Sequence, residues 1–525
     1  MKPYKIALVV VFNLVISLGF YIKNENARIQ DISSDLANII PVCKKMDNPS
    51  LYENDLYLNN IDNVKYYTPF YVQPLRFIAN FTHHDYLDAL NILGLITHII
   101  YGILWFFLYY SLKKDFWLAF IFSIFTRGVL WPPGGELLGI SDLWTIMPRT
   151  LFIALLPLPF LIYLNFKKNN LIVTSIVLGF IFNFHAISGV GAILLYLFVY
   201  ITYLAIQKTP FKEISKKVVT ALLFCFIGMI PFLLTYASNV SSEIILDKNT
   251  LNTALHSRIS DIFFDPILFI KSWHRPVTYI LGFLFLTFFF FDTSKNKQTF
   301  KILFFSALGI FIAANASVYI ELFINTIFKK NILLSFQLIR FQKFVLVLFQ
   351  IGIFLLGVEL FNLLKIQNSI KISVFCIYIG LLSFSNNQIF DQIPLLSDDV
   401  TRAILPRNLQ FFKSKPTDYS YSDMVDYIAK NTKKEDVFYG YNSFLIRAGA
   451  SRAVVLDSKG ASMLIEGNQK QFIKWHFDYQ KLNALPENQI IRFLKSKKVD
   501  YVVSKTFNKK LHLVKKIKAV YLYKL

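Results

Sequence analysis

Seven acidic residues in segment 23–87 have the chemical type needed for general base catalysis: Asp31, Asp35, Asp47, Glu53, Asp55, Asp62 and Asp85. Asp31 and Asp35 follow an apolar run by only about three helical turns, so either carboxylate can lie at a membrane boundary and face a cavity. A partly desolvated carboxylate there suits the removal of a proton from an acceptor hydroxyl that attacks a lipid-linked donor. Asp55 is a candidate substrate-binding residue. The alternative is that each acid is a solvated loop residue.

Two arginines at the edges of apolar runs have the chemistry to hold a phosphate. Arg149 stands immediately before one apolar run, and Arg340 lies in the amphiphilic stretch 335–343. A charge at mid-bilayer costs about 2.5–3.5 kcal/mol and persists mostly with a partner, and a lipid phosphate fits the guanidinium fork. Snorkelling to headgroups, or pairing with an acid such as Glu136, is an equal alternative. Weaker candidates of the same kind are Arg127, Arg258 and Arg275.

His185 and Glu136 complete the set of substrate-binding candidates. His185 lies beside an apolar run, where a polar side chain must face protein or a cavity. It can contact a phosphate or a sugar hydroxyl, or it can be a packing histidine hydrogen-bonded to a neighbouring backbone group or to Ser188. Glu136 ends the turn that begins at Trp131. That turn can form the lip of a cavity, although anchoring in the interfacial aromatic belt is the stronger interpretation.

The sequence contains no strong metal or cofactor motif. His83, His84 and Asp85 are adjacent, so their side chains point in different directions, and they lack the spacing of a known zinc motif. The three cysteines, Cys43, Cys225 and Cys376, form neither a CxxC site nor a disulfide framework. We therefore predict no certain cofactor, and a divalent ion, Mg²⁺ or Mn²⁺, stays open.

The composition is that of a membrane protein. Hydrophobic residues make up 55% of the 525 residues and aromatic residues 17%, and the mean hydropathy is +0.47. These values exceed those of soluble enzymes of this length. The formal charge of +22 comes in large part from lysines in short connections between apolar runs, where they set orientation. Nucleic acid is therefore not an expected partner.

The apolar runs predict about eleven membrane-spanning helices, each near the length needed to cross about 30 Å of hydrocarbon. They fall roughly at 6–22, 88–111, 116–131, 148–165, 171–185, 187–206, 217–237, 277–291, 301–320, 341–364 and 371–387. The first run has a charged start but no cleavage site, which indicates an uncleaved span. We expect these helices to form a transmembrane domain at 1–390, with the loop 23–87 after the first helix.

The lysines predict the orientation of this domain. If the N-terminus is cytoplasmic, five basic connections all fall on the cytoplasmic side, as the positive-inside rule requires. They contain Lys113 and Lys114, Lys167 and Lys168, Lys208 to Lys217, Lys295 to Lys301, and Lys365 with Lys371. Only Lys329 and Lys330 conflict with this scheme. It places the loop 23–87, a second loop at about 238–276 and the C-terminal region outside the cytoplasm.

The C-terminal region predicts a small water-soluble α/β domain at 416–525, after a linker at 391–415. Its candidate strands are Val437–Tyr441, Ala453–Asp457, Tyr501–Ser504 and Ala519–Tyr523, and its candidate helices lie at about 420–431, 468–482 and 487–497. Basic residues outnumber acidic ones about twofold there, which suits anionic headgroups or an anionic glycan, or merely solubility.

Several short motifs resemble the GT-C superfamily of polyprenyl-phosphate-dependent glycosyltransferases, and most closely its poorly characterised bacterial branches. In chain order they are Asp31-Ile-Ser-Ser-Asp35-Leu-Ala-Asn, Asp47-Asn-Pro-Ser-Leu-Tyr-Glu-Asn-Asp55, Asn183-Phe-His185-Ala-Ile-Ser188-Gly189, Gln337-Leu-Ile-Arg340 and Arg452-Ala-Val-Val-Leu-Asp457. The resemblance implies a polytopic helical transferase of the cell envelope. In that superfamily an aspartate of the loop after the first span is the expected base, which corresponds to Asp35 or Asp31. The paired acidic dipeptide of several branches is missing, so the choice between the two stays open.

The resulting hypothesis is a membrane glycosyltransferase of glycan biosynthesis. A polyprenyl-phosphate sugar is the expected donor and a lipid, glycan or protein the acceptor, with membrane lipids as neighbours and inversion at the sugar. We expect a location in a bacterial inner membrane. The other open classes are a transporter or lipid flippase, for which no internal hydropathy repeat is visible, and a non-catalytic assembly protein of the cell envelope.

Overall fold

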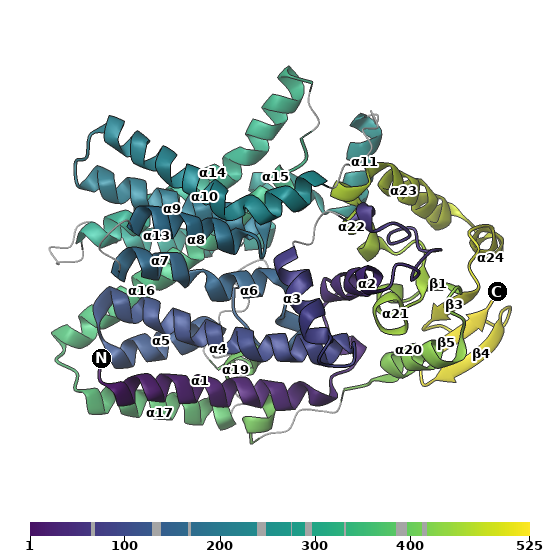
Figure 1. Cartoon of the computed structure of the whole chain (residues 1–525), viewed down its shortest axis with the longest axis horizontal. Coiled ribbons are helices and arrows are strands. Elements are labelled where there is room, and N and C mark those ends of the chain that lie inside the picture. The colour runs from purple at the N-terminus through teal and green to yellow at the C-terminus, as the bar shows by residue number, and fades with distance from the viewer. Residues whose placement is uncertain are drawn as a thin grey trace. The chain divides into compact units, whose positions relative to one another are not determined.

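The chain folds into two compact units, each assembled from three separate segments. The computed structural model describes residues 1–64, 69–128, 138–165, 170–238, 248–274, 276–288, 297–329, 332–384, 396–411 and 417–525. Unit 1 contains Met1–Lys23, Gly94–Leu233 and Asp261–Ser414, and unit 2 contains Asn24–Leu93, Leu234–Ser260 and Lys415–Leu525. The colours in Figure 1 allow each segment to be followed along the chain.

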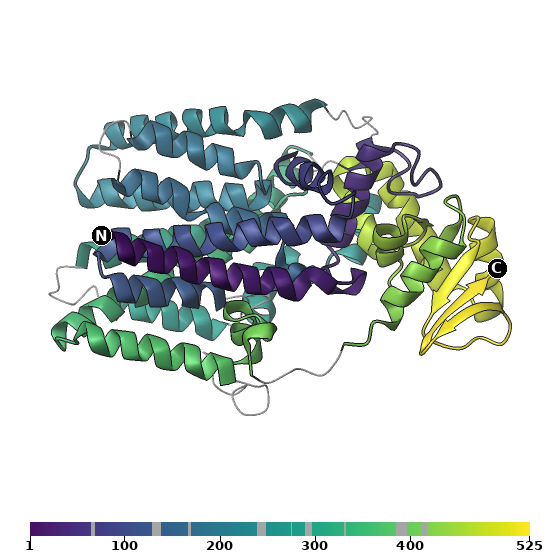
Figure 2. The same cartoon turned by 60° about the horizontal axis from the view of Figure 1, so that its bottom comes forward.

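Unit 1 is a bundle of apolar helices that run side by side (Figures 1 and 2). Its longer helices are α1 (Pro3–Lys23), α4 (Tyr86–Lys113), α5 (Phe116–Gly128), α6 (Pro148–Leu155), α7 (Pro157–Asn165), α8 (Asn170–Phe182), α9 (Ala186–Ile206), α10 (Phe211–Ser238), α13 (Pro276–Phe288), α14 (Lys297–Ile327), α16 (Lys343–Leu363) and α17 (Asn368–Phe384). The first eight residues of α4, about two turns, and the last five of α10 belong to unit 2. Short helical pieces join them: η4 (Leu143–Thr145), η5 (Asp261–Phe264), α12 (Pro266–Leu268), η6 (Phe269–His274), α15 (Ser335–Leu338), η7 (Ile339–Gln342), α19 (Asp398–Ile404) and η8 (Arg407–Leu409).

Each of the eleven predicted apolar segments contains helix, but over the described residues fewer than eleven of these helices are long enough to cross a membrane. In the described parts of the chain, seven stretches are long and apolar enough to cross a membrane: Pro3–Asn26, Tyr86–Lys113, Pro148–Asn165, Ala186–Ile206, Phe211–Tyr236, Lys297–Ile327 and Ser335–Leu363. The other four predicted spans correspond to shorter apolar helices at Phe116–Gly128, Asn170–Phe182, Pro276–Thr287 and Asn368–Phe384. Hydropathy reported the apolar runs correctly, whereas helix length also depends on where the backbone turns.

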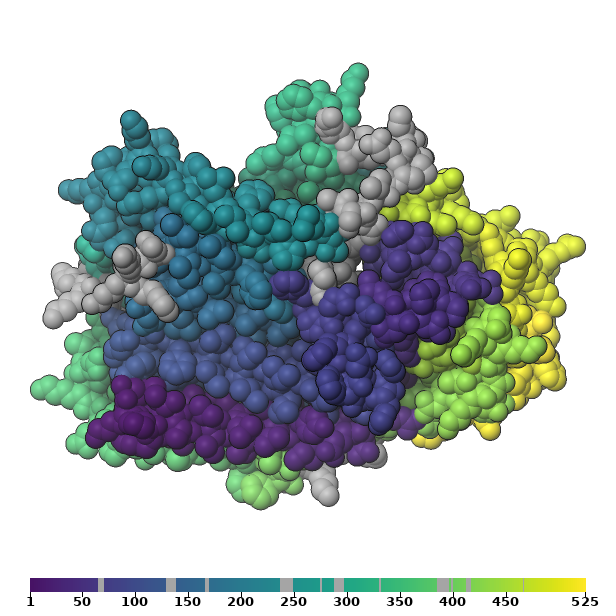
Figure 3. Space-filling model, viewed as in Figure 1, coloured from purple at the N-terminus to yellow at the C-terminus, as the bar shows by residue number. Residues whose placement is uncertain are grey.

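The outer surface of unit 1 is apolar, as expected for a protein in a bilayer. Along α1, the side chains of Val11 and Val15 are about half exposed, and on α10 Leu223 and Phe226 are exposed to a similar degree. The space-filling view shows α1 lying along one face of this unit (Figure 3). Water would disfavour so much exposed apolar surface, but lipid does not. The chain is therefore an integral membrane protein of the helical type.

A proline divides the predicted span 148–165 into α6 and α7. Pro157 has no backbone N–H and its ring crowds the carbonyl of Ile153, four residues earlier. That carbonyl accepts hydrogen bonds from the N–H of Leu156 at 3.3 Å and from the indole Nε1 of Trp105 on α4 at 3.2 Å. A backbone group freed by proline thus gains a partner from a neighbouring helix, as it must in an apolar environment.

Asn183 supports α10 beside Pro231 in the same way. Its Nδ2 donates to the carbonyl of Gly228 at 2.9 Å, and its Oδ1 accepts from the N–H of Phe232 at 2.7 Å. A regular helix would join those two backbone groups directly. Gly179 on α8 faces Gly228, and a Cβ on Gly179 would come within 2.0 Å of the carbonyl oxygen of Cys225. The two helices therefore approach backbone to backbone.

Replacing Asn183 by leucine should destabilise the contact between α8 and α10. The change removes both hydrogen bonds and leaves two backbone groups in an apolar setting, at about 1–3 kcal/mol for each unsatisfied group. Thermal unfolding of the purified protein in detergent measures the effect. The matched control is Asn362→Leu, at an exposed position of α16. Equal midpoints for the two variants would show that Asn183 carries no such role.

Arg127 is a structural residue of the bundle. This fully buried arginine donates from Nη2 to Asn13 Oδ1 (3.1 Å) and to the carbonyl of His98 (2.6 Å), and its Nη1 lies 2.9 Å from His98 Nδ1. These partners lie on α1 and α4, so the guanidinium joins three helices. A group so enclosed has no access to a lipid phosphate.

Unit 2 contains a five-stranded sheet in the order β2-β1-β3-β5-β4. The strands are β1 (Val437–Gly440), β2 (Ala453–Val454), β3 (Tyr501–Ser504), β4 (His512–Ile517) and β5 (Val520–Lys524). β1 pairs in parallel with β2 and β3, whereas β5 is antiparallel to both β3 and β4. The helices of this C-terminal part are α20 (Ser420–Asn431), α21 (Ser443–Ala450), α22 (Ser458–Gly467), α23 (Gln469–Ala484) and α24 (Glu487–Ser496).

The predicted α/β content of 416–525 is confirmed, with three omissions. All four predicted strands and all three predicted helices occur within a few residues of their predicted places. The strand β4 was missed because its sequence, His-Leu-Val-Lys-Lys-Ile, is an exposed edge strand without a clear apolar face. The helices α21 and α22 were missed because each is short and contains glycine.

The segment after α1 is folded into unit 2 with the C-terminal region. It forms η1 (Asn24–Asn26), η2 (Ile29–Asp31), α2 (Leu36–Asp47), η3 (Ile61–Asn63) and α3 (Pro69–Ala79). The third segment of the unit contributes α11 (Lys248–Arg258). Here α2 packs on α21 and α11 packs on α23. The hydropathy pattern predicts that these segments are outer loops of a transmembrane domain, separate from the C-terminal domain. Their contacts instead place them in one unit with the C-terminal region.

Candidate functional site

Asp35 is the candidate base with a carboxylate accessible to a ligand. It precedes α2 at the helix N-cap position, yet its side chain does not cap the helix. Ser33 Oγ accepts the hydrogen bond from the N–H of Leu36 instead. The carboxylate of Asp35 pairs with the ammonium of Lys459, with Oδ1 and Nζ 2.6 Å apart, and its side chain is 39% exposed. A carboxylate beside a cation and open to solvent can meet both a hydroxyl and an anion.

Lys459 is held in place at the start of α22. Asp457 caps this helix, and its Oδ1 accepts from the backbone N–H of Lys459 at 2.9 Å. Asn38 on α2 donates from Nδ2 to the backbone carbonyl of Lys459 at 3.1 Å. Both contacts fix the backbone from which the lysine side chain extends towards Asp35.

Arg258 adds a second cation to this cluster. Burial lowers the pKa of Arg258, and the carboxylates of Asp457 and Asp35 partly offset that effect, which places both within electrostatic range. Within the described part of the chain, its buried Nε has no hydrogen-bond partner. A buried guanidinium donor without a partner costs stability unless a ligand supplies an acceptor. Asp35, Lys459 and Arg258 are hereafter the polar cluster.

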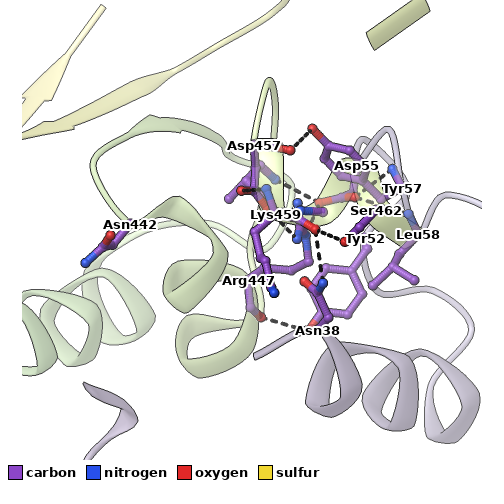
Figure 4. A network of polar contacts seen from close by, with 12 residues as sticks. Asn38, Tyr52, Asp55, Tyr57, Leu58, Asn442, Arg447, Asp457, Lys459 and Ser462 are labelled. Atoms are coloured by element: carbon purple, nitrogen blue, oxygen red, sulfur yellow. Dashed lines mark hydrogen bonds and ion pairs between the residues drawn. The ribbon is translucent and has the colours of Figure 1, made fainter. Parts of the chain in front are cut away.

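A buried ion-pair network supports the polar cluster (Figure 4). Arg447 on α21 donates from Nε to Asp55 Oδ2 at 2.9 Å and from Nη1 to Asp457 Oδ2 at 3.0 Å. The second oxygen of Asp55 accepts from the N–H groups of Tyr57 and Leu58. Through Asp457, the network connects residues 52–58 to the helix that carries Lys459. Burial lowers the pKa of Arg447, but Asp55 and Asp457 more than offset this, so the net pKa is raised and the charge is retained.

Asp55, a predicted substrate-binding residue, is a buried member of a structural ion pair. Its side chain is 0% exposed, and its acceptors are occupied by Arg447 and by backbone N–H groups, including that of Val454. The ring of Tyr57 covers the guanidinium of Arg447 at 4.5 Å. Sequence alone could not distinguish a solvated loop carboxylate from one buried by a distant arginine.

Asp31 has a structural role at the chain segment that follows α1. One carboxylate oxygen of Asp31 accepts from the backbone N–H of Arg28 at 2.7 Å, and the other from the hydroxyl of Tyr419 at 3.2 Å. Arg28 in turn pairs with Asp423 and Asp426 on α20. Asp31 therefore fixes the chain after α1, and Asp35 is the better candidate for the base.

The remaining sequence candidates belong to unit 1. Arg340 in η7 lies over the ring of Phe263 at 5.5 Å and donates to Gln337 Oε1 at 3.4 Å. Arg149 on α6 donates to the sulfur of Met147 at 3.3 Å. His185 caps α9, with Nδ1 accepting from the N–H of Ser188 at 3.1 Å, as the packing interpretation expects. Phosphate binding by these three residues stays a prediction. Glu136 and Arg275 lie outside the described residues.

The described residues do not form a metal site. Among the described residues, no group of three or more His, Cys, Asp or Glu side chains is arranged to hold an ion. His84 Nδ1 lies 4.0 Å from Asp47, but no further acid or histidine of the described chain completes a site. A role for Mg²⁺ or Mn²⁺ stays untested.

A histidine contacts α11, the helix that carries Arg258. Ser257 Oγ lies 2.8 Å from His476 Nδ1 on α23. Burial lowers the pKa of His476 below its usual value, so the folded protein binds this proton less readily than the unfolded chain. Stability from this group is therefore complete above about pH 6.5 and is lost as the pH falls below that value towards the folded-state pKa.

We expect α11 to become more dynamic in mild acid. Amide hydrogen exchange in 248–260 should accelerate between pH 7.5 and pH 5.5, after correction for the intrinsic pH dependence of exchange. The variant His476→Gln should remove most of this pH dependence, because glutamine does not titrate. An unchanged pH response in that variant would exclude His476 as the cause.

The polar cluster can bind an anion and accept a proton. Two cations can provide charge-assisted hydrogen bonds of the kind that hold a phosphate, and Asp35 is an accessible carboxylate paired with one of them. Fold and cluster together define the class of the chain, an integral helical membrane protein with a folded polar unit that carries a charged cluster. No protein-family model matches the chain, and no curated protein matches its sequence.

Proposed function

We propose that the chain is a membrane glycosyltransferase that moves a sugar from a polyprenyl-phosphate donor to an acceptor hydroxyl. The observation that carries the proposal is the polar cluster, an accessible carboxylate paired with one cation and in the field of a second cation, whose buried Nε has no hydrogen-bond partner among the described residues. The extensive apolar surface of unit 1 suits a lipid-linked donor. The resemblance of the segment Asp31 to Asn38 to the GT-C superfamily agrees with this assignment.

In the proposed reaction, the acceptor oxygen attacks the anomeric carbon of the donor sugar. The bond from that carbon to the phosphate oxygen breaks, and polyprenyl phosphate leaves with the bonding electron pair. Asp35 takes the proton of the acceptor hydroxyl, and the sugar is transferred with inversion. Lys459 and Arg258 neutralise the charge that grows on the leaving phosphate.

The pairing of Asp35 with Lys459 couples donor binding to base strength. An opposite charge nearby stabilises a carboxylate and makes it a weaker base. A phosphate that takes Lys459 as its partner removes this stabilisation from Asp35. The carboxylate is then a stronger base when a donor occupies the cluster.

Native mass spectrometry of the protein, purified gently from its host membrane, tests the donor assignment. The wild type should retain a polyprenyl phosphate or its sugar conjugate, and the adduct mass identifies the sugar. Lys459→Gln and Arg258→Gln should lose most of the adduct, whereas Arg492→Gln, at an exposed site on α24, should keep it. An adduct of equal abundance in all four proteins would contradict the role of the polar cluster. Arg340→Ala tests the separate prediction for unit 1.

A further inference from the structure

Two exposed phenylalanines form an apolar patch at the end of α3. Phe77 is 64% exposed and Phe81 is 72% exposed, and their ring centroids lie 5.2 Å apart. The opposite side of α3 is buried, with Tyr71, Val72 and Leu75 at most 1% exposed. A single exposed apolar side chain needs no explanation, but two in contact, one on the exposed side of α3 and one just after its end, indicate a surface that something apolar covers.

The patch is attached rigidly to the first residue of α4. Asp47 accepts from Arg76 Nε at 2.6 Å and also from the hydroxyl of Tyr86. The carboxylate therefore joins the residue next to Phe77 to the start of the apolar helix. The position of the patch is fixed with respect to that helix end.

The turn between α3 and α4 has a defined backbone. His83 and His84 adopt left-handed conformations, with φ values of 51° and 61°, and the N–H of His84 donates to the carbonyl of Ala79 at 2.9 Å. Asp85 Oδ1 then accepts from the N–H groups of Leu87 and Asp88 and caps α4. This reversal keeps Phe81 close to Phe77.

The length of α4 places its first residue near the lipid headgroups. The helix has 28 residues and ends at Lys113, next to Lys114. A hydrocarbon stretch of about 20 residues that ends at Tyr110, beside this basic pair, begins at Asn91. Tyr86 then lies about 7 Å beyond the hydrocarbon, within a headgroup layer of about 5–8 Å.

We infer that Phe77 and Phe81 dock on the lipid bilayer at the membrane–water boundary. Aromatic side chains are favoured at that depth, and the patch is fixed at the helix end that enters the bilayer. α3 is then an interfacial anchor that holds the loop after α1 on the membrane surface. This inference does not depend on a transferase activity. A protein partner would be the alternative occupant, but the chain continues directly from the patch into an apolar helix, which favours lipid.

Site-directed fluorescence in liposomes of zwitterionic lipid tests the inference. In a Cys376→Ser background, which leaves only the buried thiols Cys43 and Cys225, a nitrobenzoxadiazole label is attached to Phe81→Cys or to the control Phe477→Cys. Phe477 on α23 is 59% exposed, so both labels start from similar solvent exposure. Spin-labelled lipid should quench the label at 81 several-fold more than the label at 477, and aqueous iodide should show the reverse preference.

Two results would overturn the inference. One is iodide quenching at 81 as strong as at 477, which would place the patch in water. The other is shielding at 81 that needs added membrane protein extract, which would identify a protein partner. As a second readout, Phe77→Ser with Phe81→Ser should speed tryptic cleavage after Arg76 in liposomes several-fold, whereas Phe477→Ser should not. Unchanged cleavage in the double variant would also contradict lipid docking.

Discussion

Asp35→Asn should lower the rate of sugar transfer by about 10²–10⁴-fold, the contribution expected of a general base. Asparagine has nearly the same size as aspartate but cannot take the acceptor proton. The variant also frees Lys459 from its ion pair, so donor binding should be retained or strengthened. A loss in kcat without a loss of bound polyprenyl phosphate distinguishes the removal of a base from the disruption of a binding site.

Two other aspartates serve as controls for this substitution. Asp62→Asn changes an exposed acid of the same segment and should leave the rate unchanged. Asp31→Asn weakens contacts to Arg28 and Tyr419, so it should lower the yield of folded protein more than the rate per folded molecule. Two results would refute the assignment of the base. One is a wild-type transfer rate for Asp35→Asn, and the other is a larger loss of transfer rate per folded molecule for Asp31→Asn than for Asp35→Asn.

Arg447→Met should destabilise unit 2 by about 3–5 kcal/mol, because it leaves the buried carboxylates of Asp55 and Asp457 without their counter-charge. Hydrogen exchange in the peptides that cover α21 and α22 should accelerate by at least about a hundredfold, at one factor of ten for each 1.4 kcal/mol. Transfer should fall as well, since Asp457 no longer holds the backbone of Lys459 in place.

A double substitution separates the network from simple packing. Each single substitution leaves the other member of the Asp55–Arg447 pair as an unpaired buried charge. Combining Asp55→Leu with Arg447→Met removes both charges, so the loss of stability should be smaller than the sum of the two single losses. Arg492→Met, at an exposed site, should be nearly neutral. Strictly additive losses in the double variant would contradict the coupling between Asp55 and Arg447.

The fold could be predicted from the sequence where local patterns determine it. Apolar runs located the longer helices of unit 1, and short strand-length runs located four of the five strands of unit 2. The predicted span count exceeds the seven long apolar helices of the described residues, because hydropathy locates apolar runs but does not report the length over which each run stays helical. The composition of unit 2 could not be predicted either, since α2, α11 and α21 come from distant parts of the chain and contain too few apolar residues to indicate mutual burial.

Part of the candidate site could be predicted from the sequence, because a local pattern marks one of its residues but not the others. Asp35 was chosen because a carboxylate follows an apolar span at short distance, which is a local pattern. Its partners Lys459 and Arg258 are 424 and 223 residues away in the chain, so no local pattern could pair them. Asp55 shows the opposite case. Its local setting resembles a solvated loop, and only the fold reveals that Arg447 encloses it.

The motif from Asn183 to Gly189 illustrates how packing can explain residues first noticed for chemistry. Asn183 satisfies the backbone of α10, His185 caps α9, and a Cβ on Gly189 would come within 2.4 Å of the ring of Phe182. Each residue type therefore has a structural reason to be present. A chemical role for His185 needs a separate test, such as the retention of polyprenyl phosphate by His185→Asn.

The most direct test of the account follows the donor lipid during turnover. Purified protein in nanodiscs is incubated with isotope-labelled polyprenyl-phosphate sugars from the host membrane and with a cell-envelope extract as acceptor. We predict that free polyprenyl phosphate and labelled glycoconjugate appear in equal amounts, and that neither appears with Asp35→Asn. Two results would contradict a glycosyltransferase. One is movement of the labelled lipid across sealed vesicles without any covalent change, and the other is the absence of reaction in both the wild type and Asp35→Asn.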